Sequence, residues 1–287
     1  MEEKWDIVIK PRERLLSVDF AEIWRYRDLC SLFVKRNIAT SYKQTILGPL
    51  WFVIQPALTV IMYMVVFGGI AGIPTDGVPQ PMFYMAGLCV WQYFASCLNS
   101  TGNTFVNNAG IFGKVYFPRL VMPVADVISN LLKFGIQLGL FFVVYLYYIV
   151  LGFDIAPNWY VLLFPLLLIM TAGLALGFGI LVSSMTTKYR DLQIFFSFFV
   201  QLWMYATPIV YPLSQVGNRT VAGISLHTIM SLNPVTPIIE TFKYGWLNAG
   251  EFIGWGWLGY SFGFMVVLLA VGIVIFNKVQ KSFMDTV

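Results

Sequence analysis

The sequence predicts an all-α integral membrane protein. It should have six transmembrane helices, an amphipathic N-terminal interface helix, and external re-entrant helices between spans five and six. Of its 287 residues, 58% are hydrophobic and 11% are charged, whereas water-soluble chains carry about 25% charged residues. The mean hydropathy is +0.74. In addition, several long stretches contain no Asp, Glu, Lys or Arg. Most of the chain therefore faces lipid.

The charge-free stretches define the spans, because a charge at the bilayer centre costs about 2.5 to 3.5 kcal/mol. Those of bilayer length are 44–75, 77–113, 134–153, 155–187, 192–218, 220–239 and 252–277. The window 220–239 contains Pro234 and Pro237, which free backbone groups that lipid cannot satisfy. We therefore treat this window as non-spanning or re-entrant. The predicted spans are 50–70, 82–101, 125–150, 159–184, 193–212 and 257–276.

The basic residues orient these spans. Nine of the 18 Lys and Arg residues precede the first span, and six more lie at the even-numbered junctions or after the last span. Basic residues accumulate on the cytoplasmic side of a bilayer, so both termini are expected in the cytoplasm. The first residues are charged and lack an apolar run, so no signal peptide is expected.

Residues 1–49 form the predicted cytoplasmic N-terminal segment, and residues 50–287 form the transmembrane domain. From Phe20 onward, apolar side chains cluster on one side of a helical wheel. This pattern is typical of a helix lying in the membrane interface. A helix packed on the cytoplasmic side of its own protein fits the pattern equally well. The helix should end near Gly48 and Pro49.

The third span begins with a polar stripe. Asp126, Asn130, Lys133 and Gln137 recur at steps of four, three and four, so they share one helix face. The stripe fits either a helix whose first turns protrude into the cytoplasm or a polar face buried in the bundle or along an aqueous path. We favour protrusion, because burying Lys133 in lipid is costly.

Two spans carry aromatic stripes. In the first, Gln55, Thr59, Tyr63 and Phe67 recur at every fourth residue. The fifth adds Phe196, Phe199, Trp203 and Tyr205. Aromatic rings stack on the apolar faces of sugars, so stripes of this kind could line a glycan path. Ordinary helix packing and anchoring at the interface are the alternative for each single ring.

Several kinds of chemistry are missing from the sequence. The string nearest to a phosphate-binding loop, GIFGKV at 110–115, has the wrong spacing and the wrong last residue. One histidine and three scattered cysteines give no metal constellation. No pair of acids lies close in sequence at a predicted membrane surface. We therefore expect no catalytic, cofactor-binding or metal-binding residues in this chain, and no nucleic acid partner.

Four segments resemble one family. WRYRDLCSLFVKRNIATSYKQTILGPLWFVIQP (24–56) is similar to the opening of permease subunits of bacterial ATP-binding-cassette polysaccharide exporters, which export O-antigen, capsule or teichoic acid chains. NNAGIFGKVYFPRLVMPVADVISN (107–130), KYRDLQ (188–193) and TPIVYP followed by LNPVTPIIE (207–212 and 232–240) look like later segments of the same family. The segments occur in the family's order and extend over nearly the whole chain.

The resemblance implies a permease subunit of the bacterial inner membrane that is not itself an enzyme. It implies a homodimer bound to two copies of a separate ATPase subunit, which would hold ATP and Mg. A coupling helix at about 107–119 would contact that ATPase, and a second contact would lie in the loop after the fourth span. An external gate segment would occupy about 213–256. The coupling residues are Lys114, Tyr116, Phe117, Pro118, Arg119, Lys188 and Arg190.

The resemblance also implies a substrate, a polysaccharide linked to polyprenyl diphosphate, most simply an O-antigen. Basic residues near the first span would meet the arriving lipid diphosphate, and the aromatic stripes would carry the glycan. The basic set is Arg25, Arg27, Lys35, Arg36 and Lys43. These residues could instead set topology or contact anionic lipid. Two other functions fit: a similar exporter of a drug or small lipid, or a membrane enzyme acting on polyprenyl-linked sugars.

Overall fold

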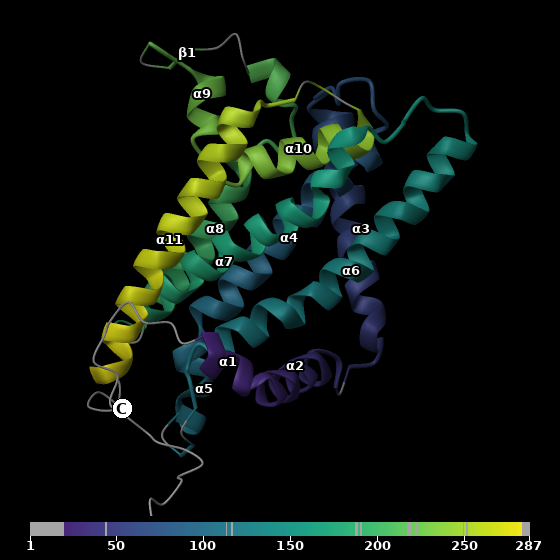
Figure 1. Ribbon diagram of the computed structural model, residues 1–287. Helices are drawn as coiled ribbons and strands as arrows, with labels where there is room; N and C mark the ends of the chain where they lie inside the picture. Colours follow the sequence, from purple (N-terminus) through teal and green to yellow (C-terminus); the bar gives the residue numbers. More distant parts are fainter. Residues whose placement is uncertain are drawn as a thin grey trace, which may run out of the picture.

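The computed structural model is a bundle of α-helices with one short β-hairpin (Figure 1). It describes residues 20–43, 45–112, 114–115, 117–186, 189, 191–216, 220–221, 223–248, 250 and 252–282. For this part of the chain the predicted all-α class is confirmed.

Two helices precede the bundle. They are α1 over Phe20–Arg25 and α2 over Arg27–Tyr42, and α2 lies across the lower end of the bundle in Figure 1. The helix does not extend to Gly48 as predicted. It ends at Tyr42, because Lys43 has an extended backbone, and Pro49 lies in a separate 3₁₀ turn over Gly48–Leu50.

Four helical segments in the described residues are long and apolar enough to cross a membrane. They are Gly48–Ile70, Val121–Val150, Trp159–Thr186 and Trp255–Val279. They coincide with the first, third, fourth and sixth predicted spans. The first segment contains α3 (Trp51–Tyr63) and its π-helical continuation over Met64–Ile70. The second is α6 (Val121–Val150), and the third is α7 (Phe164–Thr186) with a 3₁₀ turn over Trp159–Leu163 before it. The fourth lies in α11 (Trp255–Ser282).

Two further helices lie where the second and fifth spans are predicted. The first, α4 over Gln80–Gly102, has 23 residues, most of them buried against neighbouring helices. The second, α8 over Asp191–Tyr205, has only 15 residues. It ends seven residues before the predicted end at 212. The reason is Pro208, because the residue before a proline is restricted from helical backbone geometry.

The centre of the bundle is held together by close contacts at glycines. A Cβ atom at Gly179 of α7 would collide with Thr101 of α4 and lie 3.3 Å from the backbone nitrogen of Gly102. A Cβ atom at Gly177 would lie 2.9 Å from Cγ of Leu268 in α11. Small residues of this kind let transmembrane helices approach closely. Helix α7 is thus packed between α4 on one side and α11 on the other.

The end of the bundle that carries α2 holds an aromatic cluster. The short helix α5 spans Thr104–Phe112. Its Phe105 stacks on Phe276 of α11 with ring centroids 4.7 Å apart, and its Phe112 contacts Phe117 at 5.7 Å. Phe117 in turn lies 5.7 Å from Phe33 of α2. We call Phe33, Phe105, Phe112, Phe117 and Phe276 the basal aromatic cluster.

The opposite end carries the segment between α8 and α11. It contains a 3₁₀ turn (Leu213–Val216), strands β1 (Thr220–Val221) and β2 (Ile224–Ser225), α9 (Leu226–Ser231) and α10 (Thr236–Leu247). The strands pair antiparallel, with Val221 opposite Ile224. Most side chains of α10 are buried, and α10 contacts α4 and α7. The segment is therefore largely part of the packed fold, as its apolar composition suggests.

Candidate functional site

The candidate site is a groove between α3, α4 and α6 with a volume of about 350 Å³. Two kinds of side chain face it, aromatic rings and neutral amides or hydroxyls. The aromatic residues are Trp51, Phe52, Tyr63, Trp91, Tyr93 and Phe134. The amides and hydroxyls are Gln55, Thr59, Gln92, Ser96, Asn99, Asn130 and Gln137. Aromatic rings beside amides suit sugar rings, which have apolar faces and hydroxylated edges.

The polar face of α6 forms one wall of this groove. Nε2 of Gln137 donates to Oε1 of Gln92 in α4 at 2.6 Å, and Nδ2 of Asn130 donates to Oγ of Ser100 at 2.9 Å. These contacts support the second of the two interpretations of the α6 stripe. Its middle and far end face the bundle and the groove rather than protruding.

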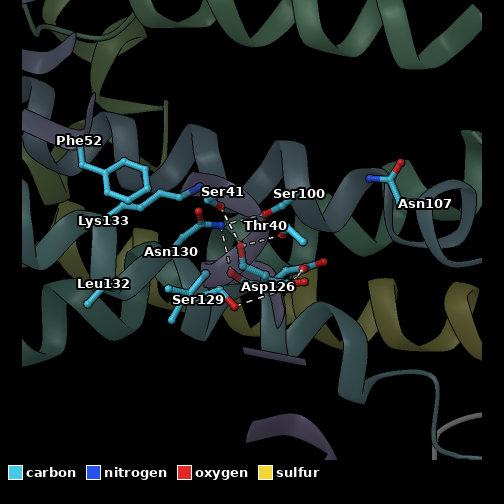
Figure 2. A pocket seen from close by; sticks show the side chains of 12 residues that line it. Thr40, Ser41, Phe52, Ser100, Asn107, Asp126, Ser129, Asn130, Leu132 and Lys133 are labelled. Atoms are coloured by element: carbon cyan, nitrogen blue, oxygen red, sulfur yellow. Dashed lines mark hydrogen bonds between the residues drawn. The ribbon is translucent and has the colours of Figure 1, made fainter. Parts of the chain in front are cut away.

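A second cavity of about 290 Å³ lies between α2 and the rest of the bundle and adjoins the groove. We call it the cavity beneath α2. Figure 2 shows Asp126 and Ser129 of α6 pointing into it together with Thr40 and Ser41 of α2. Asp126 accepts hydrogen bonds from Nδ2 of Asn37 at 2.8 Å and from Oγ1 of Thr104 at 3.2 Å. Phe52, Asn130 and Lys133 line both cavities.

The predicted path residues do not form one continuous stripe. Tyr63 lines the groove, and its hydroxyl donates to Sδ of Met204 in α8 at 3.3 Å. Phe67 is half-buried behind it, with ring centroids 5.2 Å apart. Trp203, by contrast, packs in the core between α4 and α7, because its ring lies 5.2 Å from Phe94 and 5.1 Å from Phe178.

The other path residues of α8 lie outside the groove. Phe199 and Tyr205 are exposed, and Phe196 is half-buried beside Phe195. Helical spacing predicted correctly that Phe199 and Trp203 are neighbours, with centroids 5.7 Å apart. It did not predict that the groove wall opposite α3 is made by α4 and α6.

Sequence reasoning missed the contribution of α4. Gln92, Ser96, Asn99 and Asn103 recur at steps of four, three and four, the same pattern that drew attention to α6. The first three line the groove. A search of every span for polar residues at helical spacing would have found them.

The described members of the predicted coupling set, Lys114, Phe117, Pro118 and Arg119, follow α5. The helix there covers Thr104–Phe112 instead of 107–119. Phe117 is 5% exposed and Pro118 is also buried, so both side chains pack within this chain, and their role in contacting the ATPase stays a prediction. The ring of Phe117 packs inside the basal aromatic cluster, against Phe33 and Phe112. Tyr116, Lys188 and Arg190 lie outside the described residues.

Two other residues of this turn are exposed, Lys114 and Val115. Arg119 is half-buried, with its guanidinium 5.6 Å from the ring centroid of Phe112. Burial lowers the pKa of Arg119 from its ordinary value. Among the described residues of this turn, Lys114 and Val115 are thus the ones exposed to another protein.

The predicted basic residues of the N-terminal helices are spread over their surface. Arg25, Arg27, Lys35 and Lys43 are exposed. Arg36 is half-buried, and its Nη2 donates to Oδ1 of Asn108 at 3.1 Å. Arg36 thus fastens α2 to α5, and together with the buried Phe33 it shows that α2 packs on its own protein.

A buried ion pair lies in α10 at the other end of the molecule. Nζ of Lys243 is 3.0 Å from Oε1 of Glu240, and Lys243 also donates to the carbonyl oxygen of Pro208. Its ammonium lies 4.1 Å from the ring centroid of Phe83. Burial, and then the charge of Glu240, raise the pKa of the nearby Tyr211 to about 12. Lys243 is therefore a structural group that joins α10, α4 and the chain after α8.

Among the described residues, no three His, Cys, Asp or Glu side chains lie close enough together to hold a metal ion. The groove itself contains amides, hydroxyls, aromatic rings and one ammonium group. Such a site can bind a polar, ring-containing ligand. Its described residues do not include a nucleophile paired with a base.

Known proteins resemble this chain over most of its length. The O-antigen export system permease protein RfbA of Myxococcus xanthus is 27% identical over 223 residues, which cover 77% of this chain and 81% of the relative. A protein of the same name from Klebsiella pneumoniae is 29% identical over 262 residues, covering 90% and 94%. The polysialic acid transport protein KpsM of Escherichia coli is 22% identical over 259 residues, covering 88% and 93%.

The ABC-2 type transporter family matches residues 28–247. The match includes α3, α4 and α6, the three helices that form most of the groove, and it covers well over half of the chain. This chain is therefore a member of the ABC-2 type transporter family.

Proposed function

We propose that this chain is the channel-forming permease subunit of an ATP-driven exporter. Its substrate would be a polysaccharide linked to polyprenyl diphosphate, most simply an O-antigen, which crosses the bacterial inner membrane. The observation that carries the proposal is the length of the similarity, because relatives named as O-antigen export permeases match up to 90% of this chain. The aromatic and amide lining of the groove agrees with a sugar substrate.

The proposed topology has six spans. The four long apolar segments would be joined by α4 and α8. At 1.5 Å per residue, the 23 residues of α4 extend about 35 Å, enough to cross a hydrocarbon core of about 30 Å. Packing against α6, α7 and α10 covers many of its side chains, so α4 can be less apolar than a lipid-facing helix. An even number of spans places both termini on the same side, the cytoplasm.

Two copies of this chain would assemble with two copies of an ATP-binding-cassette ATPase, and ATP and Mg would bind to that partner. Of the described residues in the turn after α5, Lys114 and Val115 are exposed and would meet it. Behind them, the basal aromatic cluster connects the turn to α2, α5 and α11 through ring contacts of 4.7 to 5.7 Å. Because closely packed rings deform little, a displacement of the turn would be passed to these helices.

The test is deletion of the gene in its own bacterium, followed by separate assays of surface polysaccharide and of lipid-linked polysaccharide inside the cell. We expect the surface polysaccharide to disappear while the full-length chain accumulates inside. An unchanged surface polysaccharide would favour an exporter of a drug or small lipid. Loss of synthesis itself would favour a membrane enzyme. Assaying lipopolysaccharide and capsule separately identifies the exported polymer.

A further inference from the structure

Lys133 lies where the two cavities of the candidate site meet. Its side chain, together with Phe52 and Asn130, lines both the groove and the cavity beneath α2. It follows Val121, the first residue of α6, by 12 positions, or about 18 Å of helix. Lys133 therefore stands well inside the molecule, at the junction of a cavity lined mainly by hydroxyls and amides and a groove lined by rings and amides.

Lys133 has no close ion-pair partner among the described residues, and the charge that acts on it across the cavity is that of Asp126. Within the described residues, its ammonium makes no hydrogen bond and no ion pair, and its nearest aromatic contact is Phe52, whose ring centroid is 5.7 Å from Nζ. The acid on the same helix face, Asp126, accepts hydrogen bonds from Asn37 and Thr104 instead. Figure 2 shows the Lys133 side chain running alongside Phe52, with its nitrogen end toward Ser41.

The neighbouring polar groups are already paired with one another. Gln137 donates to Gln92, and Asn130 donates to Ser100 and to the backbone oxygen of Asp126. These amide pairs hold the walls in place. Lys133 is therefore a partly buried cation with open space beside it. A cation that is removed from bulk water is stabilised by an anion within hydrogen-bonding distance.

We propose that Lys133 binds the phosphate of a lipid-linked sugar and that the groove above it holds the first sugar rings. The anion is a phosphate in this proposal because a compact ammonium binds phosphate as a point charge, and a phosphate offers it several acceptor oxygens. Trp91, Gln92 and Gln137 are placed to contact the attached sugar. The site is separate from the five basic residues predicted to meet the lipid diphosphate, four of which lie in α1 and α2 and the fifth, Lys43, directly after α2.

This inference rests on the proposed export function and adds to it a location for the charged part of the substrate. The experiment uses the purified full-length chain in nanodiscs of phosphatidylcholine. The probe is a polyprenyl diphosphate that carries N-acetylglucosamine, and binding is followed by native mass spectrometry. The comparison ligands are the uncharged polyprenol and phosphatidylglycerol, which separate a lipid-linked sugar from an ordinary anionic phospholipid.

We expect Lys133→Gln to weaken binding of the sugar-bearing probe about tenfold or more, the effect of losing one charge-assisted hydrogen bond. Lys133→Arg keeps the charge and should bind within a few-fold of the unsubstituted chain. Lys278→Gln removes an exposed charge from α11 and is the matched control, with no expected change. Thermal unfolding of each variant shows whether the fold is retained.

Equal binding by the Lys133→Gln variant and the unsubstituted chain would overturn the assignment. If phosphatidylglycerol binds as well as the probe, and both depend on Lys133, the proposal that the groove recognises the sugar would be overturned. These results are independent of the deletion test. A strain that loses surface polysaccharide on deletion and regains it fully with Lys133→Gln would keep the export function and reject this site.

Discussion

Nδ2 of Asn37 in α2 donates a 2.8 Å hydrogen bond to Oδ1 of Asp126 in α6. The helix that precedes the first span is thereby fastened to the third span, at the cavity beneath α2. Asp126 has a second donor in Thr104 of α5. Helices α2, α5 and α6 therefore meet at one carboxylate.

Replacing Asn37 should loosen this junction. We expect Asn37→Leu to lower the free energy of unfolding by about 1.5 to 3 kcal/mol, because a hydrogen bond to a partly buried charged acceptor is lost. The measurement is thermal unfolding of the purified chain in detergent. Ser31→Ala, an exposed position of the same helix, is the control and should unfold like the unsubstituted chain.

Substitutions at Phe117 and Lys114 should have different effects, the first on the stability of the fold and the second on coupling to ATP hydrolysis. Phe117→Ala removes a buried ring from the basal aromatic cluster, so we expect a loss of about 3 to 5 kcal/mol in the free energy of unfolding. The side chain of Lys114 is exposed, so Lys114→Ala should leave the free energy of unfolding unchanged. The same substitution should reduce the response of ATP hydrolysis to substrate in the assembled transporter. Normal coupling in Lys114→Ala, with both subunits assembled, would remove this residue from the proposed contact.

The close approach of α4 and α7 can be tested with one methyl group. Gly179→Ala places a Cβ atom against Thr101 and near the backbone of Gly102, and we expect a destabilisation of about 1 to 3 kcal/mol from overpacking. The control is Gly139→Ala in α6, where the added Cβ atom would meet no other part of the described structure within 4 Å beyond the neighbouring backbone of its own helix. If the two variants unfold at the same temperature, the helices are not packed as closely as described.

The ion pair of α10 predicts a non-additive double variant. Lys243→Met leaves Glu240 buried without its cation, so we expect a loss of about 3 to 5 kcal/mol. The double variant Lys243→Met with Glu240→Leu removes both charges and should recover a large part of that loss. The comparison requires unfolding measurements on both single variants and the double variant. Simple additivity would argue against a coupled pair.

The sequence predicted the long helices well and their surroundings less well. The predicted span 125–150 lies within α6, which covers Val121–Val150. The charge-free run 134–153 located its apolar part, and the polar turns before that run belong to the same helix. The fifth span was predicted too long because Pro208 was not used as a stop signal. The four-three-four spacing on α6 identified which residues share a face. It could not show that this face meets α4, since one helix pattern contains no information about its neighbours.

The same limit explains Phe117. Its residue type suited a protein contact, but an aromatic ring next to a turn is equally suited to internal packing, and only the fold brings Phe33 and Phe112 to it. Lys133 was recognised as costly to bury in lipid. Its position between two polar cavities depends on the juxtaposition of α2, α3, α4 and α6, which the sequence pattern did not predict.

The basal aromatic cluster also constrains the order of biosynthesis. Phe33 lies in α2, which is synthesised early, whereas Phe276 lies in α11, which is synthesised after the other helices of the bundle. Since Phe105 stacks directly on Phe276, this end of the bundle cannot close until α11 has been synthesised. Chains stalled before α11 would leave the face of Phe105 uncovered, a surface that quality-control proteases or chaperones could recognise as unfinished.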